Sequence, residues 1–80
     1  MDTQGASAYR GFFYRVSVHH SHDDERWLGT IDVCRTRLDG SVEDVISHLN
    51  VPGTFETDLL ARESGDAYAR LKIDQGPFQF

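Results

Sequence analysis

The residues with the clearest chemical potential are three histidines beside an acidic run. His19, His20 and His22 precede three consecutive acids at positions 23–25. Imidazole, carboxylate and thiolate groups all bind zinc, and a closed zinc site needs four such ligands at once. A zinc site made of His20, His22, Cys34 and one acid would need the fold to bring separate segments together, and the sequence does not indicate that it does. We therefore expect no metal, and we keep a small metal- or ligand-binding domain that uses the 19–22 loop as the alternative function.

Cys34 is the only thiol of the chain, and it is the second candidate for chemistry. Arg35 and Arg37 follow it and favour the thiolate form of a neighbouring cysteine. Cysteine catalysis also needs a positioned base, which the sequence does not place beside this thiol. There is no phosphate-binding glycine loop, no nucleophile elbow and no Cys-x-x-Cys pair. We interpret Cys34 as a buried structural thiol and expect no catalytic residue, no cofactor and no enzyme activity.

Acidic residues are concentrated in the second half of the chain. Thirteen acids and eight bases give a net charge of −5, while residues 1–38 hold five of each and are neutral. Residues 39–58 contain no Lys or Arg and five acids, which are Asp39, Glu43, Asp44, Glu56 and Asp58. Net acidity argues against direct nucleic-acid binding, because lysine and arginine must neutralise phosphates. It is compatible with presenting carboxylates to a basic protein surface, and equally with keeping a small domain soluble.

Two segments alternate in the manner of strands. From Tyr9 to His20, aromatic and β-branched side chains at every second position alternate with a mostly polar series. This period of two predicts a strand with one face in the core. That face comprises Phe12, Tyr14, Val16 and Val18. The polar run 21–26 predicts a hairpin loop, and residues 27–37 predict a second strand. Its inner face comprises Trp27, Ile31 and Val33, with a glycine between them.

Residues 41–49 have the spacing of an amphipathic helix. Val42, Val45, Ile46 and Leu49 follow the i, i+3, i+4, i+7 pattern of one apolar stripe. Ser41 is a suitable N-cap after the turn residues at 39–40. We predict a helix with this stripe buried against the sheet, followed by a turn at 51–53.

The segment that begins at residue 54 has two interpretations. In one, Phe55, Leu59 and Leu60 line a second helix that ends at Gly65. In the other, strands at 56–62 and 67–74 form a hairpin about residues 63–66, and the alternation from 67 to 74 favours this. The preferred order is β-β-α-β-β, an α+β fold with a small antiparallel sheet and one helix packed on one face.

Eighty residues, or 9.1 kDa, suffice for one small domain. We divide the chain into a disordered N-terminal segment at 1–7 and a single compact domain at 8–80. No apolar run approaches the ~18 residues of a membrane span, and the first residues lack the pattern of a secretory signal. With a single cysteine, these features predict a cytoplasmic protein, either a monomer or a homodimer.

A very short, acidic, compact α+β chain without a catalytic motif resembles the phage-encoded inhibitors, in particular the anti-CRISPR proteins. The resemblance is one of general type and transfers no residue. It implies a stoichiometric inhibitor that binds a CRISPR effector subunit in a bacterial host and blocks access to DNA. We therefore hypothesise a non-catalytic protein-binding inhibitor that mimics nucleic acid. Its partner would be a basic nucleic-acid-binding protein, and its contact surface would comprise Asp39, Glu43, Asp44, Glu56 and Asp58.

Overall fold

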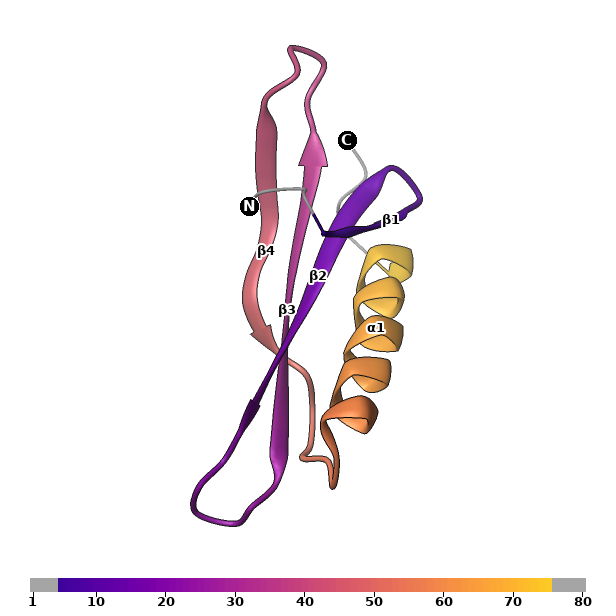
Figure 1. Cartoon of the computed structure of the whole chain (residues 1–80). Coiled ribbons are helices and arrows are strands. Elements are labelled where there is room, and N and C mark those ends of the chain that lie inside the picture. The colour runs from indigo at the N-terminus through magenta and orange to yellow at the C-terminus, as the bar shows by residue number, and fades with distance from the viewer. Residues whose placement is uncertain (1–4, 76–80) are drawn as a thin grey trace.

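The chain folds into a four-stranded antiparallel sheet with one helix packed on one face (Figure 1). The computed structural model describes residues 5–75. The strands are β1 (Ser7–Tyr9), β2 (Phe12–His20), β3 (Trp27–Thr36) and β4 (Val42–Asn50), and the helix is α1 (Asp58–Gln75). The strands lie in the sheet in sequence order. The predicted class, a small α+β fold, is confirmed.

The order of the elements differs from the prediction. The chain runs β-β-β-β-α and not β-β-α-β-β. The segment 41–49, predicted as a helix, lies almost wholly in β4 (42–50). The segment 56–74, predicted preferentially as a hairpin, lies mostly in α1 (58–75). The alternative helical interpretation of this segment has the right type of element, but α1 continues past Gly65 to Gln75.

The apolar residues of β4 have helix-like spacing because the pairing of β4 with β3 is interrupted by two register shifts. Ile31 pairs with Leu49 and Val33 with Ile46, so two steps on β3 correspond to three on β4. His48 takes a left-handed backbone conformation at this bulge, with φ of 51°. Each extra residue at a bulge shifts, by one position, which of the following side chains point to a given face of the strand. The apolar residues of β4 are therefore three, one and three positions apart, which is also the spacing of one face of a helix.

α1 packs on β2 and β3 through a stripe of mostly small residues. Ala61, Gly65, Ala69 and Ile73 are buried at a spacing of four. A Cβ atom built on Gly65 would overlap Cγ1 of Val16, so glycine lets the helix approach β2 closely. The same four-residue spacing is compatible with two-residue alternation, which explains the predicted strand at 67–74.

The core lies between α1 and the sheet. It is formed by Tyr14, Ile31, Val33, Val51, Ala69 and Ile73. The predicted inner faces of β2 and β3 are confirmed at Tyr14, Ile31 and Val33. The predicted burial of the 42–49 stripe is wrong: Val45, Ile46 and Leu49 are half-buried at the margin of the core, and Val42 is exposed. An edge strand is covered on fewer sides than a central one.

β1 is a short strand that the sequence did not indicate. It pairs with β2 across a two-residue turn at Arg10 and Gly11, both with positive φ, as tight hairpins require. Ser7, predicted within the loose segment 1–7, therefore lies in the sheet. Residues 1–4 and 76–80 lie outside the described residues.

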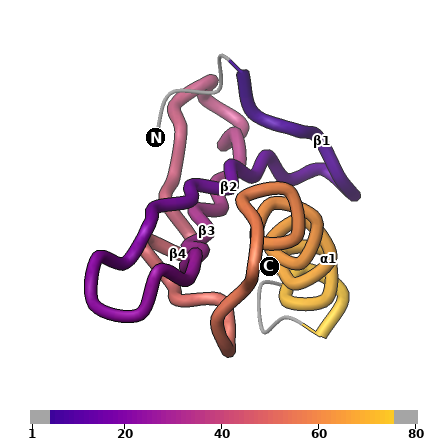
Figure 2. The backbone as a smooth tube through the Cα atoms, turned by 60° about the horizontal axis from the view of Figure 1, so that its bottom comes forward, coloured from indigo at the N-terminus to yellow at the C-terminus, as the bar shows by residue number. Residues whose placement is uncertain are grey.

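The molecule is elongated, with the β2–β3 and β3–β4 hairpin loops at opposite ends (Figure 1). Figure 1 shows the β3–β4 turn at one end, and the β2–β3 loop and the segment leading into α1 at the other. Figure 2 shows α1 lying along one side of the sheet. Over residues 5–75, no helix combines the length and the apolar composition that a membrane crossing requires.

Candidate functional site

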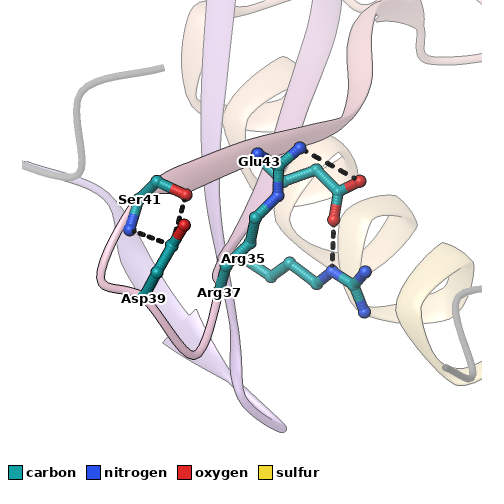
Figure 3. Close-up of polar contacts among 5 residues, drawn as sticks. All are labelled: Arg35, Arg37, Asp39, Ser41 and Glu43. Carbon is teal, nitrogen blue, oxygen red and sulfur yellow. Dashed lines mark hydrogen bonds and ion pairs between the residues drawn. The ribbon is translucent and has the colours of Figure 1, made fainter.

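Asp39 builds the β3–β4 turn. Its Oδ1 accepts hydrogen bonds from the backbone N–H of Ser41 at 2.9 Å and from Ser41 Oγ at 2.6 Å (Figure 3). These hydrogen bonds hold the pKa of Asp39 below its ordinary value, since they favour the charged carboxylate. Gly40 completes the turn with φ of 87°. Asp39 therefore has a local structural role.

Glu43 forms ion pairs within the chain. Its Oε2 accepts from Arg35 Nε at 2.7 Å, and its Oε1 lies 3.5 Å from Arg37 Nη2 (Figure 3). The hydrogen bond from Arg35, with the charge of both arginines, holds the pKa of Glu43 below its ordinary value. Asp44 is exposed on the same strand, opposite Cys34. Because two arginines lie beside these acids, the β3–β4 end carries little net charge.

Glu56 and Asp58 lie where α1 begins. Thr57 caps the helix, since its Oγ1 accepts from the backbone N–H of Leu60 at 3.1 Å. Asp58 is in the first turn, where a carboxylate is favoured by the helix dipole. Glu56 precedes the cap and has a side chain that is 78% exposed.

The structure divides the five predicted contact residues between the two ends of the sheet. Glu43 pairs with Arg35 near the end of β3, whereas Phe55, next to Glu56, pairs with Trp27 at its start. Eight residues of strand separate these positions, which is about 26 Å. The Debye length is ~10 Å at 0.1 M salt, so the two groups do not act as one electrostatic surface.

Arg26 joins the β2–β3 loop to the segment before α1. Its Nε donates to Thr54 Oγ1 at 3.0 Å and its Nη2 to the Thr54 carbonyl at 3.1 Å, and its Nη1 lies 3.9 Å from Glu56 Oε1. Trp27 and Phe55 exchange two backbone hydrogen bonds of 2.7 and 2.9 Å beside this contact. Two segments almost thirty residues apart in sequence are thereby fastened together.

This junction gathers carboxylates that the sequence analysis treated separately. We call the group the acidic end, and it comprises Asp23, Asp24, Glu25, Glu56 and Asp58. Asp24 stabilises its own loop by accepting from the backbone N–H of Arg26 at 3.1 Å. Five carboxylates and the single guanidinium of Arg26 leave a formal charge of −4. The acidic run at 23–25 was visible in the sequence, but only the pairing of Trp27 with Phe55 brings Arg26, at the end of this loop, against Glu56.

The histidines of the 19–22 segment lie far from Cys34. The rings of His20 and His22 are 5.8 Å apart, and that of His20 lies 5.0 Å from the ring of Trp27. Cys34 pairs with Phe13, seven residues along β2 from His20, which is about 23 Å away. Within residues 5–75, no group of three or more His, Cys, Asp and Glu side chains is arranged to hold a metal ion.

Cys34 is fully buried, as predicted for a structural thiol. Burial raises the pKa of the thiol, and the charge of Asp44 acts in the same direction. The effect of burial exceeds the opposing effect of the positive charge of Arg15 on β2. The thiol form is therefore favoured, and the sulfur is shielded from reagents in solution.

A polar cluster that the sequence analysis missed connects α1 to β2. The hydroxyl of buried Tyr14 donates to Asp66 and accepts from Arg70 Nε at 3.1 Å, and Arg70 also pairs with Asp66 at 3.3 Å. These contacts raise the pKa of Arg70 above its ordinary value, chiefly through the hydrogen bond with Tyr14. An open cleft of about 430 Å³ lies beside this cluster. The four-residue spacing of Asp66 and Arg70 was visible in the sequence, but their partner on β2 was not.

A second, apolar groove of about 390 Å³ lies between α1 and the segment that precedes the helix. It is lined by Val51, Pro52 and Phe55 from the preceding segment and by Ser64, Ala67, Tyr68 and Leu71 from the helix. Two leucines of α1 remain partly exposed here: Leu71, which lines the groove, is 47% exposed, and Leu60, on the same side of the helix, is 45% exposed. This groove and the acidic end are two surfaces of the described chain that are suited to contact another protein.

Comparisons of the chain with protein-family models, with curated proteins and with solved structures found no match.

Proposed function

We propose that the protein is a non-catalytic, protein-binding inhibitor that engages a basic surface of a nucleic-acid-binding protein through its acidic end. The observation that supports this is the junction at Arg26, which fastens two acidic segments together. It concentrates a formal charge of −4 in a molecule whose total is −5. The original five-residue surface is thus replaced by one that keeps Glu56 and Asp58 and adds the three acids of the β2–β3 loop.

The chemistry of such a surface determines the partner. Clustered carboxylates attract lysine and arginine over a distance of about the Debye length and accelerate association with a basic protein. A groove that binds DNA or RNA presents the required positive charge, and a protein seated there excludes phosphates. A CRISPR effector subunit is a partner of this kind. The protein then acts stoichiometrically, by occupying the groove.

The partner also needs a contact that is less sensitive to salt. Leu59 is 60% exposed in the first turn of α1, directly after Asp58. Protein interfaces combine an apolar centre with a polar rim. Leu59 supplies an apolar contact inside a rim of carboxylates, so we expect binding to weaken with salt but not to vanish.

The test compares charge reversal at the two ends of the molecule. Asp23→Lys with Glu56→Lys alters one acid from each segment of the acidic end, and Asp39→Lys with Asp44→Lys is the matched control. Each double variant changes the net charge from −5 to −1, since every reversal adds two charges. Circular dichroism establishes that both remain folded. Retention of basic proteins from a nuclease-treated bacterial lysate, and inhibition of DNA binding by a purified CRISPR effector, are then measured from low to high salt.

We expect the acidic-end variant to lose most of the retention and inhibition, and the control to keep both. Nucleic acid should compete with the wild-type protein for the same partner. Equal loss in the two variants would mean that only total charge matters. Unchanged binding in the acidic-end variant, or binding indifferent to salt, would contradict the proposal.

A further inference from the structure

The outer face of α1 carries a second apolar stripe. Leu60, Ser64, Ala67 and Leu71 recur at intervals of four, three and four residues, which is the spacing of a seam between two packed helices. Since α1 buries its other side against the sheet, this stripe faces away from the core. It extends for about 17 Å along the helix. The two leucines at its ends are nearly half exposed, so the stripe has apolar surface available for burial.

We infer that this face is the interface of a homodimer in which two α1 helices pack antiparallel about a two-fold axis. The inference does not depend on the acidic end or on the proposed function. Its occupant is a second copy of the same chain because the stripe is complementary to itself. A two-fold interface requires this property. If residue i of one chain contacts residue j of the other, then residue j of the first chain also contacts residue i of the second.

The sizes of the side chains match across the proposed axis. With the axis between Ser64 and Ala67, Leu60 of one chain meets Leu71 of the other, and Ser64 meets Ala67. Small residues at the centre permit helix axes to lie near the short end of the usual 8–10 Å range. The groove formed with Pro52, Phe55 and Tyr68 lies beside Leu71 and receives the leucine of the second chain. A parallel arrangement would oppose Leu60 to Leu60 and Leu71 to Leu71, and each small residue to its own copy.

The charges beside the stripe also match in the antiparallel arrangement. Glu63 and Arg70 both occupy the position immediately before a seam residue. In antiparallel packing these positions face each other, so Glu63 of each chain meets Arg70 of the other, and the pair occurs twice. Arg70 is held in place by its hydrogen bond to Tyr14 and its ion pair with Asp66, while half of its side chain remains exposed. A guanidinium that is already positioned loses little freedom when it binds a further carboxylate.

The first test measures the mass of the full chain in solution by sedimentation equilibrium. We expect twice the 9.1 kDa of one chain. Leu60→Glu should weaken association by at least ~tenfold, because it places an unpaired carboxylate against leucine in both halves of the interface. Leu59→Glu is the matched control, because this neighbouring leucine is exposed on another side of the helix. Both substitutions replace exposed side chains, and circular dichroism shows whether each variant is folded.

The second test examines the direction of packing by exchanging charges. Glu63→Arg and Arg70→Glu each place like charges together and should weaken their own homodimers. A mixture of the two restores both opposite-charge pairs, so the heterodimer should form in preference to either homodimer. Arg70→Glu also removes a partner of Tyr14. Should that variant unfold, chains carrying Ser64→Cys and Ala67→Cys provide the test, since their mixture should form the 64–67 disulfide across the axis.

Three results would overturn the inference. The first is a wild-type chain that stays monomeric at ~1 mM, a concentration at which even weak dimers form. The second is a Leu60→Glu variant that associates as tightly as the Leu59→Glu control. The third is a mixture of charge variants, or of cysteine variants, in which the mixed pair is not preferred.

Discussion

Replacement of Gly65 by alanine tests how closely α1 packs on the sheet. Gly65 is buried in the middle of the helix, beside Val16 of β2. A new Cβ atom would overlap Val16 Cγ1 and would lie 3.3 Å from its Cγ2. Rotation of the valine side chain does not remove the conflict, because both γ-methyl groups are close and valine is stiff at χ1. The helix or the strand must therefore move.

Two opposing effects set the size of the change. At an exposed position inside a helix, alanine is more stable than glycine by about 1 kcal/mol. Overpacking a closely packed site costs about 1–3 kcal/mol. We therefore expect Gly65→Ala to lower the free energy of unfolding by up to about 2 kcal/mol, which is a substantial part of the ~5–15 kcal/mol of a typical domain. Each kcal/mol corresponds to a fall in Tm of about 4–8 °C for a domain of this size.

Urea unfolding of a double-mutant cycle provides the assay. Val16→Ala removes the two methyl groups that Gly65→Ala would meet, so the double variant should be more stable than the sum of the single effects predicts. If residues 63–66 formed a hairpin turn, the two sites would be independent and the coupling would be zero. A Gly65→Ala variant that gains stability, or a cycle without coupling, would refute the close approach of α1 to β2.

Four further outcomes are expected. Tyr14→Phe should cost about 1 kcal/mol in urea unfolding, because the hydroxyl is lost while its two partners on α1 keep their mutual ion pair. The pKa of Glu43 is lowered in the folded state, so its contribution to the free energy of unfolding is present above the ordinary carboxyl pKa. This contribution is lost as the pH falls through the folded pKa. The Glu43→Gln variant should not show this loss of stability in an acid titration followed by circular dichroism. Leu49→Ala should cost about 1–2 kcal/mol in thermal unfolding, less than the ~2–5 kcal/mol of a fully buried leucine, since Leu49 is half-buried. Cys34 should react with a thiol reagent at pH 8 only at the rate of unfolding, and rapid labelling of the native protein would contradict its burial.

Local alternation was sufficient to predict β2, β3 and the loop between them. Their inner faces follow from a period of two, which depends only on neighbouring residues and on the need to bury one side. The loop at 21–26 was predicted because it has no apolar side chain to bury. The turn at Asp39 and Gly40 followed in the same way from residues that favour turns.

β4 and α1 were misassigned because the spacing of their apolar residues along the sequence fits both a helix and a strand. In β4 the bulge around His48, with the amide of His48 bonded to Asp32, changes the spacing of apolar residues from two to three. In α1 the buried positions lie four apart and are mostly small, so they also satisfy alternation. Gly65 favours a turn in isolation, and only contact with Val16 explains a glycine there.

The sequence by itself determined the fold class, the number of charges and the existence of an acidic segment, because composition and local period depend on no distant residue. Tertiary structure decided which carboxylates remain available to a partner. Glu43 is neutralised by Arg35 because the β3–β4 register places them opposite each other. Glu56 joins the loop acids because Trp27 pairs with Phe55. Electrostatic interactions depend on distance in space, and that distance is set by strand pairing, which the separation of residues along the chain does not reveal.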